Sequence, residues 1–181
     1  MNVLYIHGFA SCGMGNKSAA LRRYFGETSV FSPDLPADPE AAIALLEDSI
    51  RSVPDLLLVG SSLGGFYATV LAERHGLDAV VINPSVRPYD TLRPYVGTNR
   101  RFCDNRPFAW KADDLDKLKS MRREPKNGRY LVLLQTGDEV LDYRVALDYY
   151  KTSRVVVEYG GNHRFENLED YICMIERFAK G

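Results

Sequence analysis

Short apolar runs alternate with longer amphipathic segments along most of the chain. Most of the runs are bounded by glycine, proline or polar residues, as is typical of strands buried on both faces of a sheet. Six strands are predicted, at residues 3–6, 30–31, 56–59, 79–82, 130–135 and 155–157. Apolar positions at helical spacing predict helices over 16–25, 39–52, 63–75, 143–150 and 165–179. The alternation predicts an α/β fold, a mostly parallel sheet of about six strands with helices on both faces.

Residues 84–126 do not follow this alternation. Prolines and aromatic residues are scattered through them without one period, and residues 87–126 carry 11 Lys and Arg against six Asp and Glu. A long irregular insertion inside a compact domain is usually functional. The length of 181 residues is that of one domain. We therefore expect a single domain over residues 1–181, in which 84–126, called the cap segment from here on, covers a functional site.

The most informative stretch joins the predicted strand at 56–59 to the helix at 63–75. It contains Gly60-Ser61-Ser62-Leu63-Gly64, which fits the G-x-S-x-G pattern of a nucleophile elbow. In that turn the glycines leave room for neighbouring backbone, and the serine is exposed at the edge of the sheet. The pattern predicts Ser62 as a nucleophile, with Ser61 one position off the spacing. The alternative is a loop serine that caps a helix.

A serine hydroxyl is a weak nucleophile until a base takes its proton, so a histidine and an acid are expected beside it. Asp138 follows the predicted strand at 130–135, and His163 follows the strand at 155–157. The carboxyl ends of parallel strands meet at one edge of a sheet. The chain order of serine, acid and histidine is that of the α/β-hydrolases. We predict a catalytic triad of Ser62, Asp138 and His163.

Other histidines and aspartates compete for these roles. His75 closes the helix at 63–75, too far from the elbow to act as base, and His7 at the end of the first strand is expected to shape a loop. Asp142 is expected to cap the next helix, and Asp34 lies on the far side of the nucleophile strand. For His163 itself, the alternative is a solvated histidine in a polar loop.

An acyl-transfer site also needs donors for the oxyanion that forms on the attacked carbonyl. In an elbow, one donor is the backbone N–H of the residue after the nucleophile, here Leu63, and the other comes from the loop after the first strand. That loop reads His7-Gly8-Phe9-Ala10, so Phe9 is the expected second donor.

Composition excludes several classes of function. The net charge of −1 provides no general attraction for nucleic acid or anionic lipid, and no apolar run approaches the ~20 residues of a membrane span. The N-terminus lacks the basic region of a signal peptide. The three cysteines, Cys12, Cys103 and Cys173, form no CxxC pair, so neither a zinc site nor a disulfide framework is expected. These features favour a cytoplasmic protein without a metal or organic cofactor.

Longer strings of residues resemble one known family over nearly the whole chain. The matching strings are Tyr5-Ile6-His7-Gly8-Phe9, residues 58–69, Ile82-Asn83-Pro84-Ser85-Val86-Arg87-Pro88-Tyr89, residues 135–143 and Gly160-Gly161-Asn162-His163. They are similar to the small bacterial α/β-hydrolase-fold esterases of the YqiA/YcfP type, the UPF0227 group. The resemblance implies a reduced α/β-hydrolase fold without the first antiparallel strands, a Ser62–Asp138–His163 triad, and esterase or thioesterase activity.

The expected function is a serine hydrolase that cleaves a small-molecule carboxylic ester or thioester through an acyl-enzyme on Ser62. C–C bond hydrolysis, peptide hydrolysis and acyl transfer can use the same triad, and an acyl-CoA thioesterase is one specific form. A catalytically silent binding protein on the same fold is the alternative from another class. The cap segment either receives an anionic leaving group such as coenzyme A or is only a solvated cover.

Overall fold

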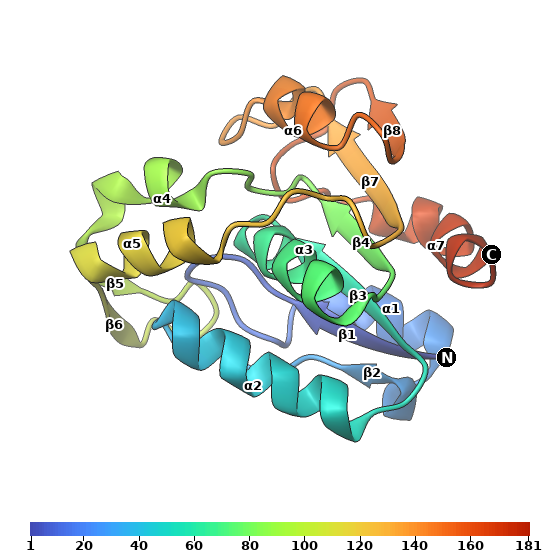
Figure 1. The fold of residues 1–181 in the computed structure, drawn as a ribbon, viewed down its shortest axis with the longest axis horizontal. Coiled ribbons are helices and arrows are strands. Elements are labelled where there is room, and N and C mark those ends of the chain that lie inside the picture. The colour runs from blue at the N-terminus through green and yellow to red at the C-terminus, as the bar shows by residue number, and fades with distance from the viewer.

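A computed structural model describes all residues, 1–181, and contains one six-stranded sheet (Figure 1). The strand order is β2-β1-β3-β4-β7-β8, and every neighbouring pair is parallel. The strands are β1 (Asn2–Ile6), β2 (Val30–Phe31), β3 (Leu56–Ser61), β4 (Ala79–Ile82), β7 (Tyr130–Gln135) and β8 (Arg154–Glu158). All six predicted strands are present, and β3 sits at the middle of the sheet, which places the elbow at the centre of its carboxyl edge.

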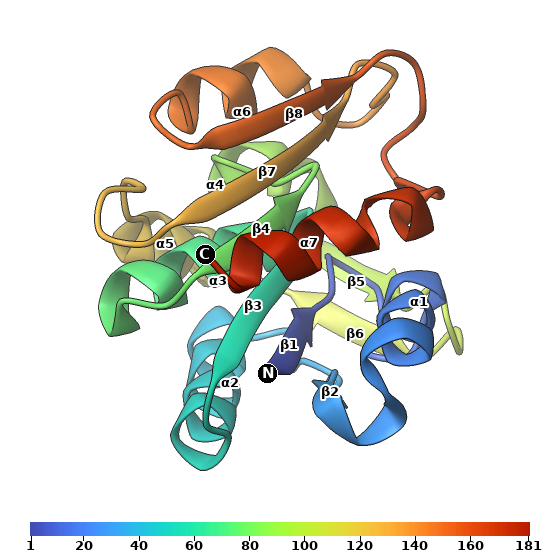
Figure 2. The ribbon, with the colours of Figure 1, turned by 90° about the vertical axis from the view of Figure 1, so that its right-hand side faces the viewer.

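Helices cover both faces of the sheet. The helices of the main fold are α1 (Asn16–Phe25), α2 (Pro39–Ser52), α3 (Leu63–His75), α6 (Tyr143–Tyr149) and α7 (Ile172–Ala179), with short 3-10 turns η1 (Glu27–Ser29) and η3 (Leu168–Tyr171). Figure 2 looks onto the face covered by α1 and α7, with α2 and α3 behind the sheet. The strand side chains alternate between two cores: Leu4 packs with α2 and α3, whereas Val3 packs with α1 and α7.

Two helices differ from the sequence prediction. Helical spacing of apolar positions predicts one buried face for α3. In the structure every residue from Leu63 to Ala72 is buried, because the cap segment and α2 also cover the face of α3 that was expected to meet solvent. The predicted helix over 165–179 begins later, as η3 and then α7. Phe165 has a left-handed backbone with φ of 50°, and its side chain lies in the core on the α1 and α7 face of the sheet. The chain therefore turns at Phe165 before the helix starts.

The cap segment is built of short elements beside the carboxyl edge. It contains α4 (Pro88–Thr91), η2 (Arg93–Tyr95), β5 (Gly97–Arg100), β6 (Pro107–Trp110) and α5 (Ala112–Met121). β5 and β6 form an antiparallel hairpin separate from the main sheet, and α5 packs against α4 and α2 (Figure 1). None of the helices combines the length and the apolar character that would be needed to cross a bilayer.

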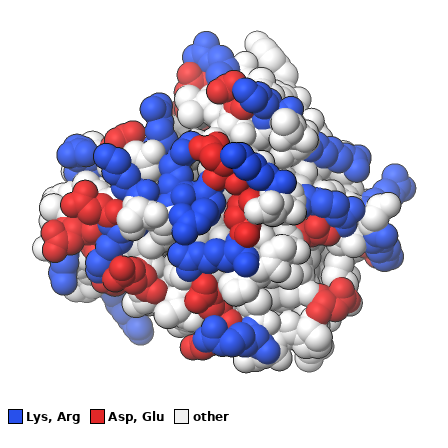
Figure 3. Space-filling model, viewed as in Figure 1, with Lys and Arg blue, Asp and Glu red and all other residues white.

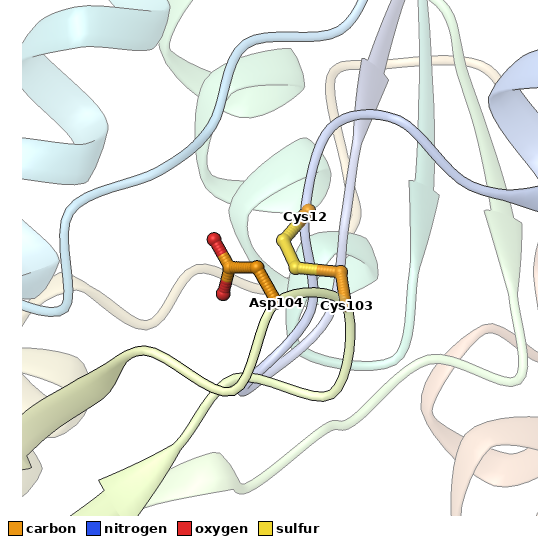
Figure 4. A group of neighbouring side chains, drawn as sticks. All are labelled: Cys12, Cys103 and Asp104. Atoms are coloured by element: carbon orange, nitrogen blue, oxygen red, sulfur yellow. A yellow bond between two sulfur atoms is a disulfide. The ribbon is translucent and has the colours of Figure 1, made fainter.

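One disulfide fastens this hairpin to the body of the protein. It joins Cys12, in the loop after β1, to Cys103, in the turn between β5 and β6 (Figure 4). Phe102 N–H donates a hydrogen bond of 2.8 Å to the Ala10 carbonyl beside it. The prediction that no disulfide forms was therefore wrong. The two cysteines are 91 residues apart in sequence, and only the fold brings the loop and the hairpin together.

The disulfide should stabilise the fold by restricting the unfolded chain. Closing so long a loop contributes about 2–4 kcal/mol in typical cases. We expect Cys103→Ser to lower the free energy of unfolding in urea by that amount when no reductant is present. A reductant should bring the wild type to the same value, and Cys173→Ser, which removes the free exposed cysteine, should change little. Three titratable thiols in the unreduced, unfolded wild type, rather than one, would contradict the pairing.

Candidate active site

Ser62 occupies a strained turn between β3 and α3. Its backbone has φ of 56° and ψ of −120°, a conformation that non-glycine residues rarely adopt. Ser62 N–H donates to the Ile82 carbonyl at 3.0 Å, and the Ser62 carbonyl accepts from Ser85 N–H at 3.0 Å. A Cβ on Gly64 would lie 2.0 Å from the Ile6 carbonyl oxygen, so only glycine allows β1 to end against the turn.

The structure brings together the three residues predicted for the triad. His163 Nε2 lies 3.1 Å from Ser62 Oγ, and His163 Nδ1 lies 2.8 Å from Asp138 Oδ2 and 3.0 Å from Asp138 Oδ1. A ring that donates from Nδ1 to a carboxylate keeps a lone pair on Nε2, which can accept the Ser62 proton. The serine is therefore hydrogen-bonded to a base that is itself held by an acid.

Buried hydrogen bonds hold the Asp138 side chain in place. Its side chain is 2% exposed, and Oδ1 accepts hydrogen bonds from the N–H groups of Val140 and Leu141 at 2.9 and 2.8 Å. These donors and the His163 ring fix the orientation of the carboxyl group. Glu139 beside it accepts His163 N–H at 3.0 Å, and this bond lowers the pKa of the Glu139 carboxyl.

The competing aspartates have other partners. Asp142 caps α6 as expected, accepting Arg144 N–H at 3.0 Å, and its hydrogen bonds with Arg144 lower its pKa. Asp34 accepts Gly13 N–H at 2.8 Å and pairs with Arg101 at 2.7 Å, and both contacts lower its pKa. Neither carboxylate is bonded to a histidine.

The competing histidines also have other partners. His75 Nε2 lies 3.5 Å from Glu47 Oε1 at the end of α3. His7 Nε2 accepts Leu35 N–H at 3.0 Å, so Nδ1 carries the proton and donates to the Gly8 carbonyl at 2.9 Å. Burial lowers the pKa of His7, which favours this neutral form. As expected for a shaping residue, His7 ties the loop after β1 to the loop after β2.

Backbone N–H groups are available where the oxyanion donors were expected. Leu63 is the first residue of α3, so its N–H has no acceptor within the helix. Phe9 N–H forms no backbone hydrogen bond. A Cβ on Gly8 would lie 3.1 Å from Ser62 Cβ and 3.6 Å from Ser62 Oγ, so this loop passes directly beside the serine. The positive end of the α3 dipole lies at the same place.

A network that sequence reasoning missed holds the His163 loop. Asn83, 2% exposed with φ of 39°, donates from Nδ2 to the carbonyls of Asn162 and His163 at 3.0 and 3.3 Å. Its Oδ1 accepts Gln135 N–H at 2.9 Å, and Gln135 Oε1 accepts Asn162 N–H at 2.9 Å. These residues connect the ends of β4 and β7 to the histidine. The position of Asn83 at a predicted strand end was the one signal that could have found it.

A cavity of about 260 Å³ opens between the loop after β1, α3 and the cap hairpin. Aromatic side chains form much of its wall, namely Phe9, Tyr67, Phe108 and Trp110, and Phe9 packs on Phe108 and Trp110 with ring centroids 5.5 and 5.2 Å apart. The cap segment therefore supplies part of the wall of a cavity that also includes both residues expected to donate to the oxyanion.

The charges at the rim of this cavity are largely paired. Arg101 contacts Asp34 at 2.7 Å and Asp104 at 3.2 Å, and Arg106 contacts Asp104 at 3.2 Å. Figure 3 shows Lys and Arg side chains interspersed with Asp and Glu across one face. Cys12, Cys103 and Asp104 lie together (Figure 4), but sulfur atoms joined in a disulfide lack the thiolate that binds a metal.

A model of the family described as Uncharacterised protein family (UPF0227) matches residues 2–180. The chain belongs to this family. A UPF0227 protein of Shewanella woodyi is 26% identical over 99% of both chains, and one of Yersinia enterocolitica is 28% identical over 97% of both chains. The expected membership of the UPF0227 group is thus confirmed.

Solved structures with the same fold are hydrolases and esterases by name. A putative hydrolase from Agrobacterium vitis has a TM-score of 0.71 and 17% identity, covering 99% of this chain and 85% of its own. Est1E from Butyrivibrio proteoclasticus with ferulic acid bound has a TM-score of 0.72 and 15% identity, covering 98% of this chain and 86% of its own. These likenesses show the fold, which is the α/β-hydrolase fold that the sequence predicted.

Asn83→Ala tests the network behind His163. Losing the amide leaves the buried Gln135 N–H and the half-buried His163 carbonyl without the Asn83 partner, whereas the Asn162 carbonyl still accepts Phe165 N–H. An unsatisfied buried group costs about 1–3 kcal/mol. We expect the free energy of unfolding in urea to fall by at least that amount. Asn105→Ala is the matched control, since Asn105 also has a positive φ, of 59°, but is exposed in the cap hairpin. Equal losses in the two variants would contradict the role assigned to the amide.

Proposed function

We propose that this protein is a serine hydrolase that cleaves carboxylic esters or thioesters through an acyl-enzyme on Ser62. The observation that carries the proposal is the chain of hydrogen bonds from Ser62 through His163 to Asp138, beside the free N–H of Phe9. Nucleophile, base, orienting acid and oxyanion donors are the parts that acyl transfer requires. The α/β-hydrolase fold supports the same reaction class.

The first half of the reaction forms the acyl-enzyme. Ser62 Oγ attacks the carbonyl carbon while His163 Nε2 takes its proton. The oxygen of the tetrahedral intermediate accepts hydrogen bonds from the N–H groups of Phe9 and Leu63. Asp138 stays ionised and stabilises the imidazolium, which then gives its proton to the leaving alcohol or thiol.

Water completes the cycle. It attacks the acyl carbon of the ester on Ser62, and His163 takes the proton of the water and returns it to Ser62 Oγ. The carboxylic acid leaves and the starting site is restored. Each step uses only groups of this chain and water, so the proposed mechanism needs no metal or organic cofactor.

The substrate in this proposal is a small-molecule acyl ester or acyl thioester, hydrolysed by a single-domain enzyme whose cap segment covers the site. The cap supplies aromatic walls, and the arginines nearest the cavity are paired with aspartates. These contacts support a cap segment that selects substrates by their shape. They favour this role over one in which unpaired arginines of the cap bind the phosphates of coenzyme A.

Variants of the three residues test the proposal with a panel of p-nitrophenyl esters and acyl-CoA thioesters. We expect Ser62→Ala and His163→Ala to lower kcat by about 10⁴-fold or more, and Asp138→Asn by about 10⁴-fold, because the amide stabilises the wrong imidazole tautomer. The matched controls are Ser61→Ala, one residue from Ser62, and Asp142→Asn, four residues from Asp138. Each should change kcat less than about tenfold.

The same panel separates the competing functions. Turnover that survives in Ser62→Ala would place the nucleophile elsewhere. A folded wild type that hydrolyses no member of the panel would favour a binding protein on a hydrolase fold. Turnover of carbon–carbon or amide substrates in preference to esters would keep the triad and replace the substrate class.

A further inference from the structure

The cavity beside the elbow lies on one side of the reacting serine. Its lining includes Phe9 and Leu63, the residues proposed to donate to the oxyanion, and the cap residues Phe108 and Trp110. No residue of the Asp138 loop or the His163 loop lines it. The cavity therefore extends from the oxyanion position away from the histidine.

This placement decides which half of a substrate the cavity holds, if the proposed function is right. The histidine gives its proton to the leaving group, so the leaving alcohol or thiol must lie on the His163 side of the carbonyl. The other substituent of the carbonyl is the acyl chain, and it points into the cavity. A volume of about 260 Å³ is at the lower limit of the ~300–1,000 Å³ of pockets for drug-sized ligands, so the acyl group is short.

Two buried hydrogen-bond donors in the cavity wall have no partner in the protein. Tyr67 is 2% exposed and lies one helical turn after Leu63, on the same side of α3, and its hydroxyl forms no hydrogen bond within the protein. Trp110 is 2% exposed, and its indole N–H has no acceptor. Buried Tyr and Trp side chains usually find partners for these groups.

The Tyr67 hydroxyl can donate at any physiological pH. Burial, with a contribution from the Asp114 and Asp38 carboxylates, raises its pKa above the ordinary value, so it keeps its proton. Neither carboxylate is hydrogen-bonded to it. Asp114 Oδ2 accepts Lys111 N–H at 2.9 Å, Asp114 Oδ1 lies 3.6 Å from Lys117 Nζ without a hydrogen bond, and Asp38 caps α2. A protonated hydroxyl in an aromatic wall binds an acceptor atom of whatever fills the cavity.

We propose that this cavity is a subsite for short acyl groups that carry an acceptor oxygen beyond the carbonyl, such as an ether or keto oxygen. The Tyr67 hydroxyl donates to that oxygen, whereas the Trp110 N–H is buried behind the cavity surface. A site built to hydrogen-bond a substrate atom discriminates strongly against the analogue that lacks it, because the buried donor is then left unpaired. Tyr67 is thus a specificity-determining residue.

Matched ester pairs test this subsite. p-Nitrophenyl methoxyacetate and butyrate have the same chain length, as do the 4-oxopentanoate and 4-methylpentanoate esters, and each pair differs in one oxygen. The measured quantity is the ratio of kcat/KM for the oxygenated ester to that for the hydrocarbon ester. Intrinsic reactivity cancels when this ratio is compared between enzyme variants.

In Tyr67→Phe we expect the ratio to fall by about 5- to 100-fold for at least one pair, with a smaller change for the hydrocarbon ester alone. Tyr5→Phe is the control, because Tyr5 is another buried tyrosine but packs in the core on the opposite face of the sheet. An unchanged ratio for both pairs in Tyr67→Phe would overturn the proposal. So would an equal fall in Tyr5→Phe.

A binding measurement separates this proposal from the proposed function. The p-nitroanilides of methoxyacetic acid and butyric acid are titrated into Ser62→Ala with and without Tyr67→Phe, which requires no turnover. Tighter binding of the methoxyacetyl anilide, lost in the Tyr67→Phe background, supports the subsite even if the wild type cleaves no ester. Ester hydrolysis with no such preference leaves the proposed function standing and removes the subsite.

Discussion

The strained backbone of Ser62 is the constraint on which the rest of the site depends. A residue held at positive φ costs of order 1–3 kcal/mol, and here hydrogen bonds with Ile82, at the end of β4, and with Ser85, in the loop after it, hold that conformation. The turn is possible only because β1 ends against Gly64 without a side chain between them. The same close approach puts the loop after β1 beside the serine. The backbone therefore fixes the proposed nucleophile and the proposed oxyanion donors together.

Buried polar side chains position the proposed acid, Asp138, and the proposed base, His163. Both lie on loops, and their place depends on buried polar side chains, chiefly Asn83 and Gln135, that join the ends of β4 and β7 to the His163 loop. The shape of the cavity depends on the disulfide from Cys12 to Cys103. It ties the cap hairpin to the loop that carries Phe9, so the wall of the cavity and the oxyanion loop are held to one another.

The parts that sequence predicted are those with local signals. Apolar runs and glycines at fixed spacing predicted the strands and the elbow, and α1 and β2 lie at the residues expected. Asp138 and His163 could be chosen because parallel strands end at one edge. What sequence missed depends on contacts between distant segments. The full burial of α3, the turn at Phe165 and the Cys12–Cys103 disulfide arise only when the cap segment and the loops are folded against the sheet.

The central claim is that Ser62 is an activated nucleophile, and covalent labelling tests it most directly. A fluorophosphonate reacts with a serine whose neighbouring base removes its proton, and intact-mass spectrometry counts the adducts. The account predicts one adduct on the wild type, none on Ser62→Ala, and the wild-type mass shift on Ser61→Ala. Labelling that persists in Ser62→Ala, or a folded wild type that takes up no label, would contradict it.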